Sequence, residues 1–141
     1  MEDRRRLEEL ITEINLYKSQ ADILNQQLKT IEITISELKA VEDALDAIEK
    51  KEKIETLVPI GAGSFLITEI KNADEVIVGL GAGVAAKKKI EDAKKSIKEQ
   101  KAELEKTMTN MAKELRELTE RIVKLSPEAD ELLKRVRESE G

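Results

Sequence analysis

Residues 7–38 read LEELITEINLYKSQADILNQQLKTIEITISEL, and the spacing of their apolar side chains decides the fold. The apolar positions follow one another alternately three and four residues apart: Leu7, Leu10, Ile14, Tyr17, Ala21, Leu24, Leu28, Ile31, Ile35 and Leu38. A repeat of about 3.5 residues is typical of a coiled-coil seam, whereas a helix on a globular core shows a wider apolar face. The stretch therefore predicts a long helix that needs a partner helix.

A second stretch of matching length supplies the partner. Apolar residues recur at every seventh position: Ile90, Ile97, Leu104, Met111, Leu118, Leu125 and Leu132. The alternate seam positions are Lys94, Lys101, Met108, Leu115, Ile122, Ala129 and Val136. Two long helices joined by a short segment fold back on each other, so we expect an antiparallel pair. In this pair Ile48 should lie opposite Ile90, Leu38 opposite Lys101, and Leu7 opposite Leu132.

Two features interrupt the heptads. Val41 comes one position early after Leu38, which predicts a local overwinding of the supercoil. Ser126 and Pro127 form a pair typical of a helix start, with serine as the cap and proline in the first turn. We therefore expect the last turns of the second helix to kink or detach there.

The segment between the heptads has strand and turn character. Strands are predicted at residues 56–60, 64–70, 75–80 and 84–87. Hairpin turns are predicted at two near-identical glycine pairs, Gly61 with Gly63 and Gly81 with Gly83, and a further turn at residues 72–74. The fold class expected is mainly α with a small β region: a long antiparallel coiled-coil hairpin with two β-hairpins at the joined end. The boundaries expected are 1–51 for the first helix, 52–87 for the hairpins and 88–141 for the second helix.

The hairpins are too small to bury their own apolar side chains. Isolated two-stranded hairpins are marginal in water, and their open edges and uncovered apolar faces are either an aggregation hazard or an assembly surface. In such a highly charged chain we favour assembly. The residues expected to contact other subunits are Val58, Ile60, Phe65, Ile67, Val76, Val78 and Leu80.

Composition excludes several classes of function. The chain has 141 residues, of which 39% are charged and 1% aromatic, and it has neither cysteine nor histidine. We therefore expect no catalytic site, no metal, no cofactor and no compact globular core. A net charge of -5 without interleaved aromatics argues against nucleic acid as a partner. The longest apolar run, residues 76–86, is too short to span a membrane, and residues 1–20 lack the continuous apolar stretch of a signal peptide, so a cytoplasmic location is expected.

One motif resembles a dinucleotide-binding loop. Residues 81–86 (GAGVAA) satisfy the pattern G-x-G-x-x-[GA] after a predicted strand. A nucleotide-binding unit requires a second parallel strand after its helix, and here the predicted helix is followed by no strand. We interpret the glycines as turn residues.

The ends of the two seams are the candidate binding region. Coiled-coil ends fray, which would expose apolar side chains near both chain ends. The residues selected are Leu7, Leu10, Ile11, Ile14, Leu125, Leu132, Leu133 and Val136. The plainer alternative, that these residues only complete the coil, remains open for each of them.

The chain resembles the alpha-type subunits of archaeal prefoldins. The resemblance covers essentially the whole chain and is close over residues 57–93, which include VPIGAGSF at 58–65 and VIVGLGAG at 76–83. It implies an ATP-independent chaperone, with two alpha and four beta subunits joined through their strands. It further implies that coiled-coil tips hold unfolded client proteins and deliver them to a group II chaperonin. A structural coiled-coil adaptor that joins folded partners is the alternative.

Overall fold

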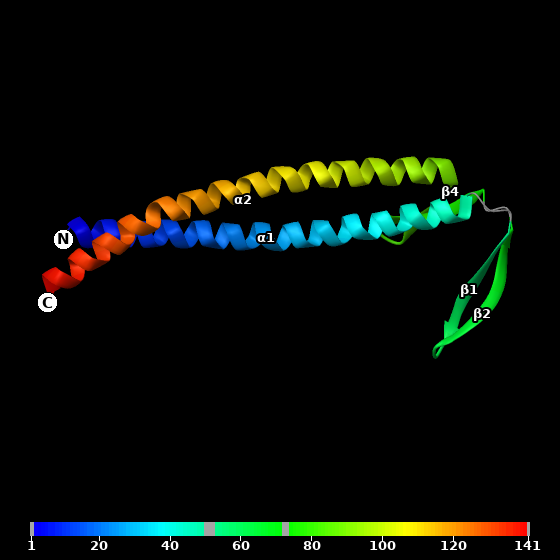
Figure 1. Ribbon diagram of the computed structural model, residues 1–141, viewed down its shortest axis with the longest axis horizontal. Coiled ribbons are helices and arrows are strands. Elements are labelled where there is room, and N and C mark those ends of the chain that lie inside the picture. Colours follow the sequence, from blue (N-terminus) through cyan, green and yellow to red (C-terminus); the bar gives the residue numbers. More distant parts are fainter. Residues whose placement is uncertain (1, 50–52, 72–73, 141) are drawn as a thin grey trace. The chain divides into compact units, whose positions relative to one another are not determined.

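The computed structural model describes residues 2–49, 53–71 and 74–140, with the exception of the side chain of Leu80. The elements follow in the order α1 (Glu2–Glu49), β1 (Lys53–Gly61), β2 (Ser64–Lys71), β3 (Glu75–Gly81), β4 (Val84–Lys89) and α2 (Ile90–Glu140) (Figure 1). The expected class, two long helices with two β-hairpins between them, is confirmed. The hairpins reach further toward the helices than expected, because β1 begins at Lys53 and β4 continues to Lys89. The expected turn at residues 72–74 lies largely outside the described residues.

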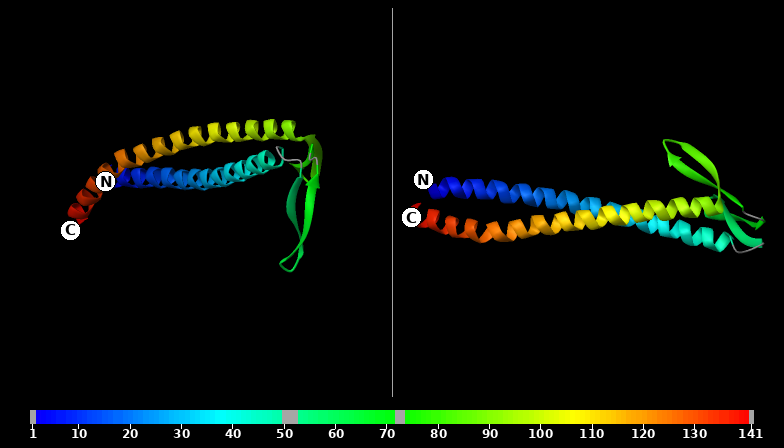
Figure 2. Two further views of the ribbon diagram at one scale, coloured as in Figure 1. Left: turned by 45° about the vertical axis from the view of Figure 1, so that its right-hand side comes forward. Right: turned by 90° about the horizontal axis from the view of Figure 1, so that it is seen from above.

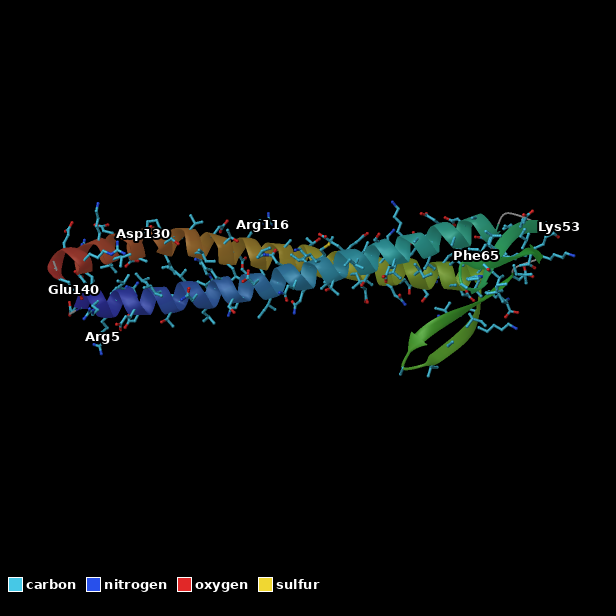
Figure 3. All side chains as sticks on the ribbon, turned by 90° about the horizontal axis from the view of Figure 1, so that it is seen from below. Arg5, Lys53, Phe65, Arg116, Asp130 and Glu140 are labelled. Atoms are coloured by element: carbon cyan, nitrogen blue, oxygen red, sulfur yellow. The ribbon has the colours of Figure 1, made fainter. Side chains whose placement is uncertain are left out.

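The chain forms two compact units, and each long helix contributes to both. The first unit contains Met1–Ile33 and Glu105–Gly141, and the second contains Thr34–Leu104. In the first unit, the blue part of α1 lies beside the orange and red part of α2 (Figure 2). Charged side chains such as Arg5 and Arg116 are exposed and point away from this helix pair (Figure 3). The seam is thus the apolar interior of the unit, as the heptads predict.

The second unit has its own core where the helices meet a hairpin. The buried residues are Leu45, Ile90, Ala93 and Ile97, with Leu38 and Ile48 packed against them. Val76 and Val78 of β3 also pack on this cluster. The second hairpin, β3–β4, therefore has one face covered by the chain's own helices. The backbone N–H of Ile90 also donates a hydrogen bond to the carbonyl of Asp74 (3.0 Å), which ties the start of α2 to the start of β3.

Two charged layers interrupt the seam of the second unit. Lys101 Nζ lies 3.3 Å from Glu42 Oε2, and Lys94 Nζ lies 2.7 Å from Glu49 Oε2. Lys94 also contacts Asp46 Oδ1 at 2.5 Å, and these two carboxylates hold the pKa of Lys94 well above its usual range. Both cations are largely covered, with 20% of the Lys94 side chain and 26% of the Lys101 side chain exposed. The acids are seven residues apart on one helix and the lysines seven apart on the other, so each pair supports the same register.

The core contacts agree with the expected register, because Ile48 packs on the cluster that contains Ile90. The long side chain of Lys101 reaches Glu42, about one helical turn along α1 from the expected neighbour Leu38, without a shift of this register. Val41, expected one position early in the seam, is 43% exposed, and Glu42, with 14% of its side chain exposed, takes the seam position instead. The interruption expected at Val41 is therefore not found at this residue, because a charged residue occupies the seam.

The detachment expected beyond Pro127 is wrong, because α2 passes through this residue as one helix and Ala129 and Leu132 beyond it are buried. Ser126 does not cap a new helix; its Oγ donates a hydrogen bond to the carbonyl of Ile122, one turn back (2.7 Å). Proline removes one backbone hydrogen bond, and serine bonds of this kind bend helices slightly. The ribbon of α2 curves in this orange region (Figure 2). The local weakness therefore produces a curve without detachment.

Both hairpins use the same turn. β1 pairs with β2 and β3 pairs with β4, each antiparallel, and each register shifts by one residue just before the turn, at Ile60 and at Leu80. Ala62 and Gly63 have φ of 48° and 74°, and the second hairpin repeats these values closely. Positive φ at both loop positions defines the turn whose twist suits adjacent strands. The predicted glycine turns are confirmed, and the structure adds that an alanine shares the left-handed conformation with each second glycine.

Leu10 offers a test of the packing in the first unit. It is fully buried, whereas Leu16 on the same helix is 54% exposed. Leu10→Ala is expected to lower the free energy of unfolding by about 2–4 kcal/mol, because it leaves a cavity in the seam. Leu16→Ala should change this free energy by less than about 0.5 kcal/mol. Urea denaturation followed by circular dichroism measures both, and equal losses would contradict the packing described.

The charged layer provides a second test. Lys101→Met is expected to destabilise the chain by about 1–3 kcal/mol, because Glu42 loses its cation while only 14% of its side chain is exposed. Glu42 Oε1 is buried and has no hydrogen-bond partner among the described residues, so the carboxylate has little else to compensate.

The matched control for this test is the double variant Glu42→Leu with Lys101→Leu. It should be at least as stable as the unmodified chain, since it removes both charges together and replaces them with apolar contacts. A double variant less stable than Lys101→Met alone would show that the pair is a net source of stability and not a device for register.

Candidate functional site

The two regions selected from the sequence are built very differently. One is an apolar cluster near the chain ends, called here the terminal cluster: Leu7, Leu10, Ile14, Ala129 and Leu132. The other is the apolar surface of the first hairpin, β1–β2, called here the hairpin surface: Leu57, Val58, Ile60, Phe65, Leu66 and Ile67. The terminal cluster is buried, whereas every member of the hairpin surface is exposed.

The terminal cluster closes the seam of the first unit. All five members are buried, and Ile122, Leu125 and Val136 pack against them partly buried. Six of the eight residues selected for client binding therefore lie within or against a closed core, and these six become available only if the helix ends separate. The two others, Ile11 and Leu133, are 45% and 37% exposed. Each directly follows a cluster residue, Leu10 and Leu132, so both border the seam.

Ion pairs between the two helices surround this cluster. Arg6 Nε lies 3.4 Å from Glu128 Oε1, Arg135 Nη1 lies 4.0 Å from Asp3 Oδ1, and Arg4 pairs with Glu140. About half of each side chain is exposed, so each pair contributes at most about 1 kcal/mol. Closure of the terminal cluster therefore depends mainly on its apolar contacts.

The hairpin surface has two apolar faces. Cross-strand partners share a face, so Leu57 with Ile67 and Pro59 with Phe65 lie on one side, and Val58 with Leu66 lies on the other. The exposed fractions run from 42% at Val58 to 67% at Ile67. A two-stranded sheet with both faces apolar and exposed has no partner within the described chain that covers it. Such a hairpin lacks the neighbouring strands or helices that would bury its apolar side chains in a complete sheet.

Charges on the same hairpin point to the same conclusion. Glu55 lies directly opposite Glu69, and Lys53 directly opposite Lys71. Like charges in directly opposite positions destabilise a strand pair. Sequence analysis missed these pairs because their identification requires the strand register. A neighbouring strand that carries complementary charges would relieve both repulsions.

The second hairpin presents a different residue from those selected. Val76 and Val78 are half-buried against the helix cluster of the second unit, while Ile77 between them is 76% exposed. Lys87 lies opposite Ile77, and its Nζ is 3.9 Å from Glu75 Oε1. Ile77 is therefore the candidate contact that alternation along β3 could have identified. The side chain of Leu80, also selected, lies outside the described residues.

No site for other chemistry is found in the described part of the chain. Residues 2–49, 53–71 and 74–140 contain no cluster of acidic side chains able to hold a metal ion. Within the same residues no helix combines the length and apolar character that crossing a bilayer requires. Gly81 and Gly83 lead from β3 into the antiparallel strand β4, so the G-x-G-x-x-[GA] match occurs in a hairpin and not at a helix start.

Two long helices with coiled-coil heptads, joined through β-hairpins with exposed strands, define a class of subunits that assemble through their sheets. Comparison with known proteins identifies the family. The family model described as "Prefoldin subunit" matches residues 17–135. The chain belongs to the prefoldin family.

Individual relatives agree with this assignment. The chain is 39% identical to the prefoldin subunit alpha of Methanobrevibacter smithii, over 94% of this chain and 90% of that protein. It is 36% identical to the prefoldin subunit alpha of Methanosphaera stadtmanae, over 95% and 96% respectively. The fold is also similar to a chain in the structure of filamentous prefoldin from Methanocaldococcus jannaschii, with a TM-score of 0.69 at 22% identity, covering 83% of this chain and 98% of that one.

The resemblance to alpha-type prefoldin subunits is therefore confirmed. The chain is a prefoldin chaperone subunit, and the family consists of chaperones and not of enzymes. Alpha-subunit identity also implies assembly with beta subunits in a prefoldin complex.

The hairpin surface can be tested through this assembly. Ile67→Glu is expected to reduce formation of the complex with a prefoldin beta subunit by at least about tenfold, because a carboxylate would have to be desolvated in the contact. Ile33→Glu is the matched control, since Ile33 is 60% exposed on α1. Native mass spectrometry measures the complex. An unchanged complex with Ile67→Glu would exclude this face of the hairpin from the assembly contact.

Proposed function

We propose that this subunit captures unfolded polypeptides at the end of the coiled coil that carries the terminal cluster. Ile11 and Leu133 make the first contacts, and the cluster residues follow when the helix ends separate. The observation that carries this proposal is the combination of a small closed core with two exposed apolar side chains at its border. Such an end offers weak and adaptable apolar contact, which suits clients that share no sequence.

Affinity then comes from several arms acting together. One end with two half-exposed aliphatic side chains binds weakly, because each contributes only about 1 kcal/mol of apolar burial. Arms joined in one assembly raise the effective concentration of the remaining ends after the first contact. No ATP hydrolysis is needed, since release requires only a competitor for the same client. We propose a group II chaperonin as this acceptor and the cytoplasm as the place of action.

Assembly places the arms together. We propose two alpha and four beta subunits per complex, joined by strands that pair with β1 and β2 and cover the hairpin surface. The like-charged pairs Glu55–Glu69 and Lys53–Lys71 are consistent with this arrangement, since strands from another subunit can place further opposite charges beside them. Val58, Ile60, Phe65 and Ile67 remain the proposed contacts, with Ile77 added from the structure. Val76 and Val78 already pack on the helix cluster of their own chain, so we no longer propose them as main contacts with another subunit.

Substitution at the exposed pair tests the proposed capture. Ile11→Ser with Leu133→Ser should weaken suppression of client aggregation by at least about threefold, because the first apolar contacts are lost from each alpha arm. The double variant Ile33→Ser with Val41→Ser is the control, since both residues are comparably exposed and neither lies next to a residue of the terminal cluster or one packed against it.

The measurement is light scattering of a chemically unfolded client in the presence of the assembled complex. The complex mass should be the same for both double variants, and the native form of the client should not bind. Full suppression by the Ile11/Leu133 variant in an intact complex would refute capture at this end. Selective binding of one native protein would favour the adaptor alternative.

A further inference from the structure

One flank of α1 lacks charge over four helical turns. Leu16, Gln20, Ile23, Gln27 and Thr30 follow one another at alternating spacings of four and three residues beside the seam. Flanking positions of this kind usually carry glutamate and lysine in coiled coils. In a chain with 39% charged residues, five consecutive uncharged flank positions are a distinct surface. We call these five residues the uncharged flank.

The two aliphatic members of this flank are exposed and one heptad apart. Leu16 is 54% exposed and Ile23 is 53% exposed. Single exposed aliphatic residues are common on protein surfaces and require no explanation. These two share one flank at the spacing by which a further helix could contact both, which scattered residues would not do.

Two open grooves meet at Ile23, both inside the first unit. One has a volume of about 440 Å³ and extends from Gln20 and Ile23 to Glu114, Glu117 and Leu118 on α2. The other has a volume of about 550 Å³ and extends along α1 from Ile23 past Gln27 to Ile31, with Met111 from α2. Together they form a shallow trough beside the helix pair.

The charge of the trough is negative on the α2 side. Glu114 and Glu117 line it, and neither forms an ion pair with another described residue. The one cation at this groove, Arg121, lies over the ring of Tyr17 with its guanidinium carbon 5.6 Å from the ring centroid. Arg121 keeps its positive charge there, so the lining carries two carboxylates and one cation. The acidic part of the rim is the turn of α2 that contains Glu114 and Glu117, and a partner helix complementary to this turn carries basic residues.

We propose that the uncharged flank is a docking site for a basic amphipathic helix of another protein, bound as a third helix beside α1 and α2. Its apolar residues, repeated every seven positions, contact Leu16 and Ile23, and its lysines or arginines face Glu114 and Glu117. The flank measures roughly 20 Å from Leu16 to Thr30, which corresponds to about four turns of the bound helix. This is recognition of a helix in a groove, with apolar anchors for affinity and charge for orientation. The site is separate from the terminal cluster and does not depend on the proposed capture of unfolded clients.

The test uses synthetic helical peptides of about 21 residues, long enough to cover the flank with one spare turn at each end. One peptide carries leucine at two positions of each heptad with lysine at the flanking positions. A second carries glutamate in place of every lysine. Calorimetry with the full chain, alone and in its complex with a beta subunit, should show binding of the basic peptide and at least about tenfold weaker binding of the acidic one.

Variants assign the binding to the flank. Leu16→Gln with Ile23→Gln should weaken the binding of the basic peptide by at least about tenfold, because two apolar anchors are lost. Glu114→Lys with Glu117→Lys should reverse the preference toward the acidic peptide. Ile33→Gln with Val123→Gln is the matched control and should leave binding unchanged, since these residues are 60% and 64% exposed but lie outside the trough.

Three results would overturn the proposal. The first is equal binding of the two peptides, and the second is an equal loss in the Ile33/Val123 control, which would indicate general hydrophobic adsorption. The third is a change in the sedimentation of the free chain caused by the Leu16/Ile23 variant, which would show that a second copy of the chain occupies the flank. Helicity measured by circular dichroism should be the same for all variants, because every substituted residue is exposed or lies on a groove rim.

Discussion

The pairing of charges across the seam is the constraint on which the second unit depends. Apolar heptads bring two helices together, but leucine and isoleucine pack almost equally well after a shift of one turn. The contacts of Lys94 with Glu49 and of Lys101 with Glu42 remove this ambiguity, because a shift in either direction would leave partly buried charges unpaired. The start of α2 is fixed in this way. The position at which Val76 and Val78 of β3 pack on the helix cluster is fixed with it.

The apolar side chains of the terminal cluster are buried, whereas those of the first hairpin are exposed. In the terminal cluster they are covered by the other helix, and only Ile11 and Leu133 remain accessible at the border. On the first hairpin they remain uncovered on both faces, although the unpaired edges of strands readily pair with other chains. A surface that is permanently exposed suits a permanent partner, and a core that can open suits a temporary one. This contrast agrees with assembly through the hairpins and with the capture proposed at the helix ends.

Much of this architecture could be predicted from the sequence, since heptads and paired glycines are local signals. The two helices, the four strands and both turns follow from them, as does the position of the apolar cluster near the chain ends. The alignment of the two seams also agrees with the core clusters. The ion pairs of Lys94 and Lys101 could not be predicted, because Glu42 was not recognised as a charged member of the seam. The helix bends near Pro127 without the expected detachment, because packing of Ile122, Leu125 and Ala129 on the other helix outweighs one missing hydrogen bond. The exposed Ile77 could have been found from the alternation along β3, whereas the like-charged pairs on β1–β2 depend on the strand register, which the structure supplies.

The like-charged pairs of the first hairpin have a consequence for subunits that have not yet assembled. Glu55 faces Glu69 and Lys53 faces Lys71, so each directly opposite pair is repulsive and is offset only by the opposite charge two residues away on the same face. A strand relieves that repulsion only if it brings a basic residue beside the two glutamates and an acidic residue beside the two lysines. An apolar strand without this pattern can cover Phe65 and Ile67 but leaves the repulsion in place. In the proposed assembly the order of charge along a neighbouring strand would thus favour one set of partner strands for this hairpin over another.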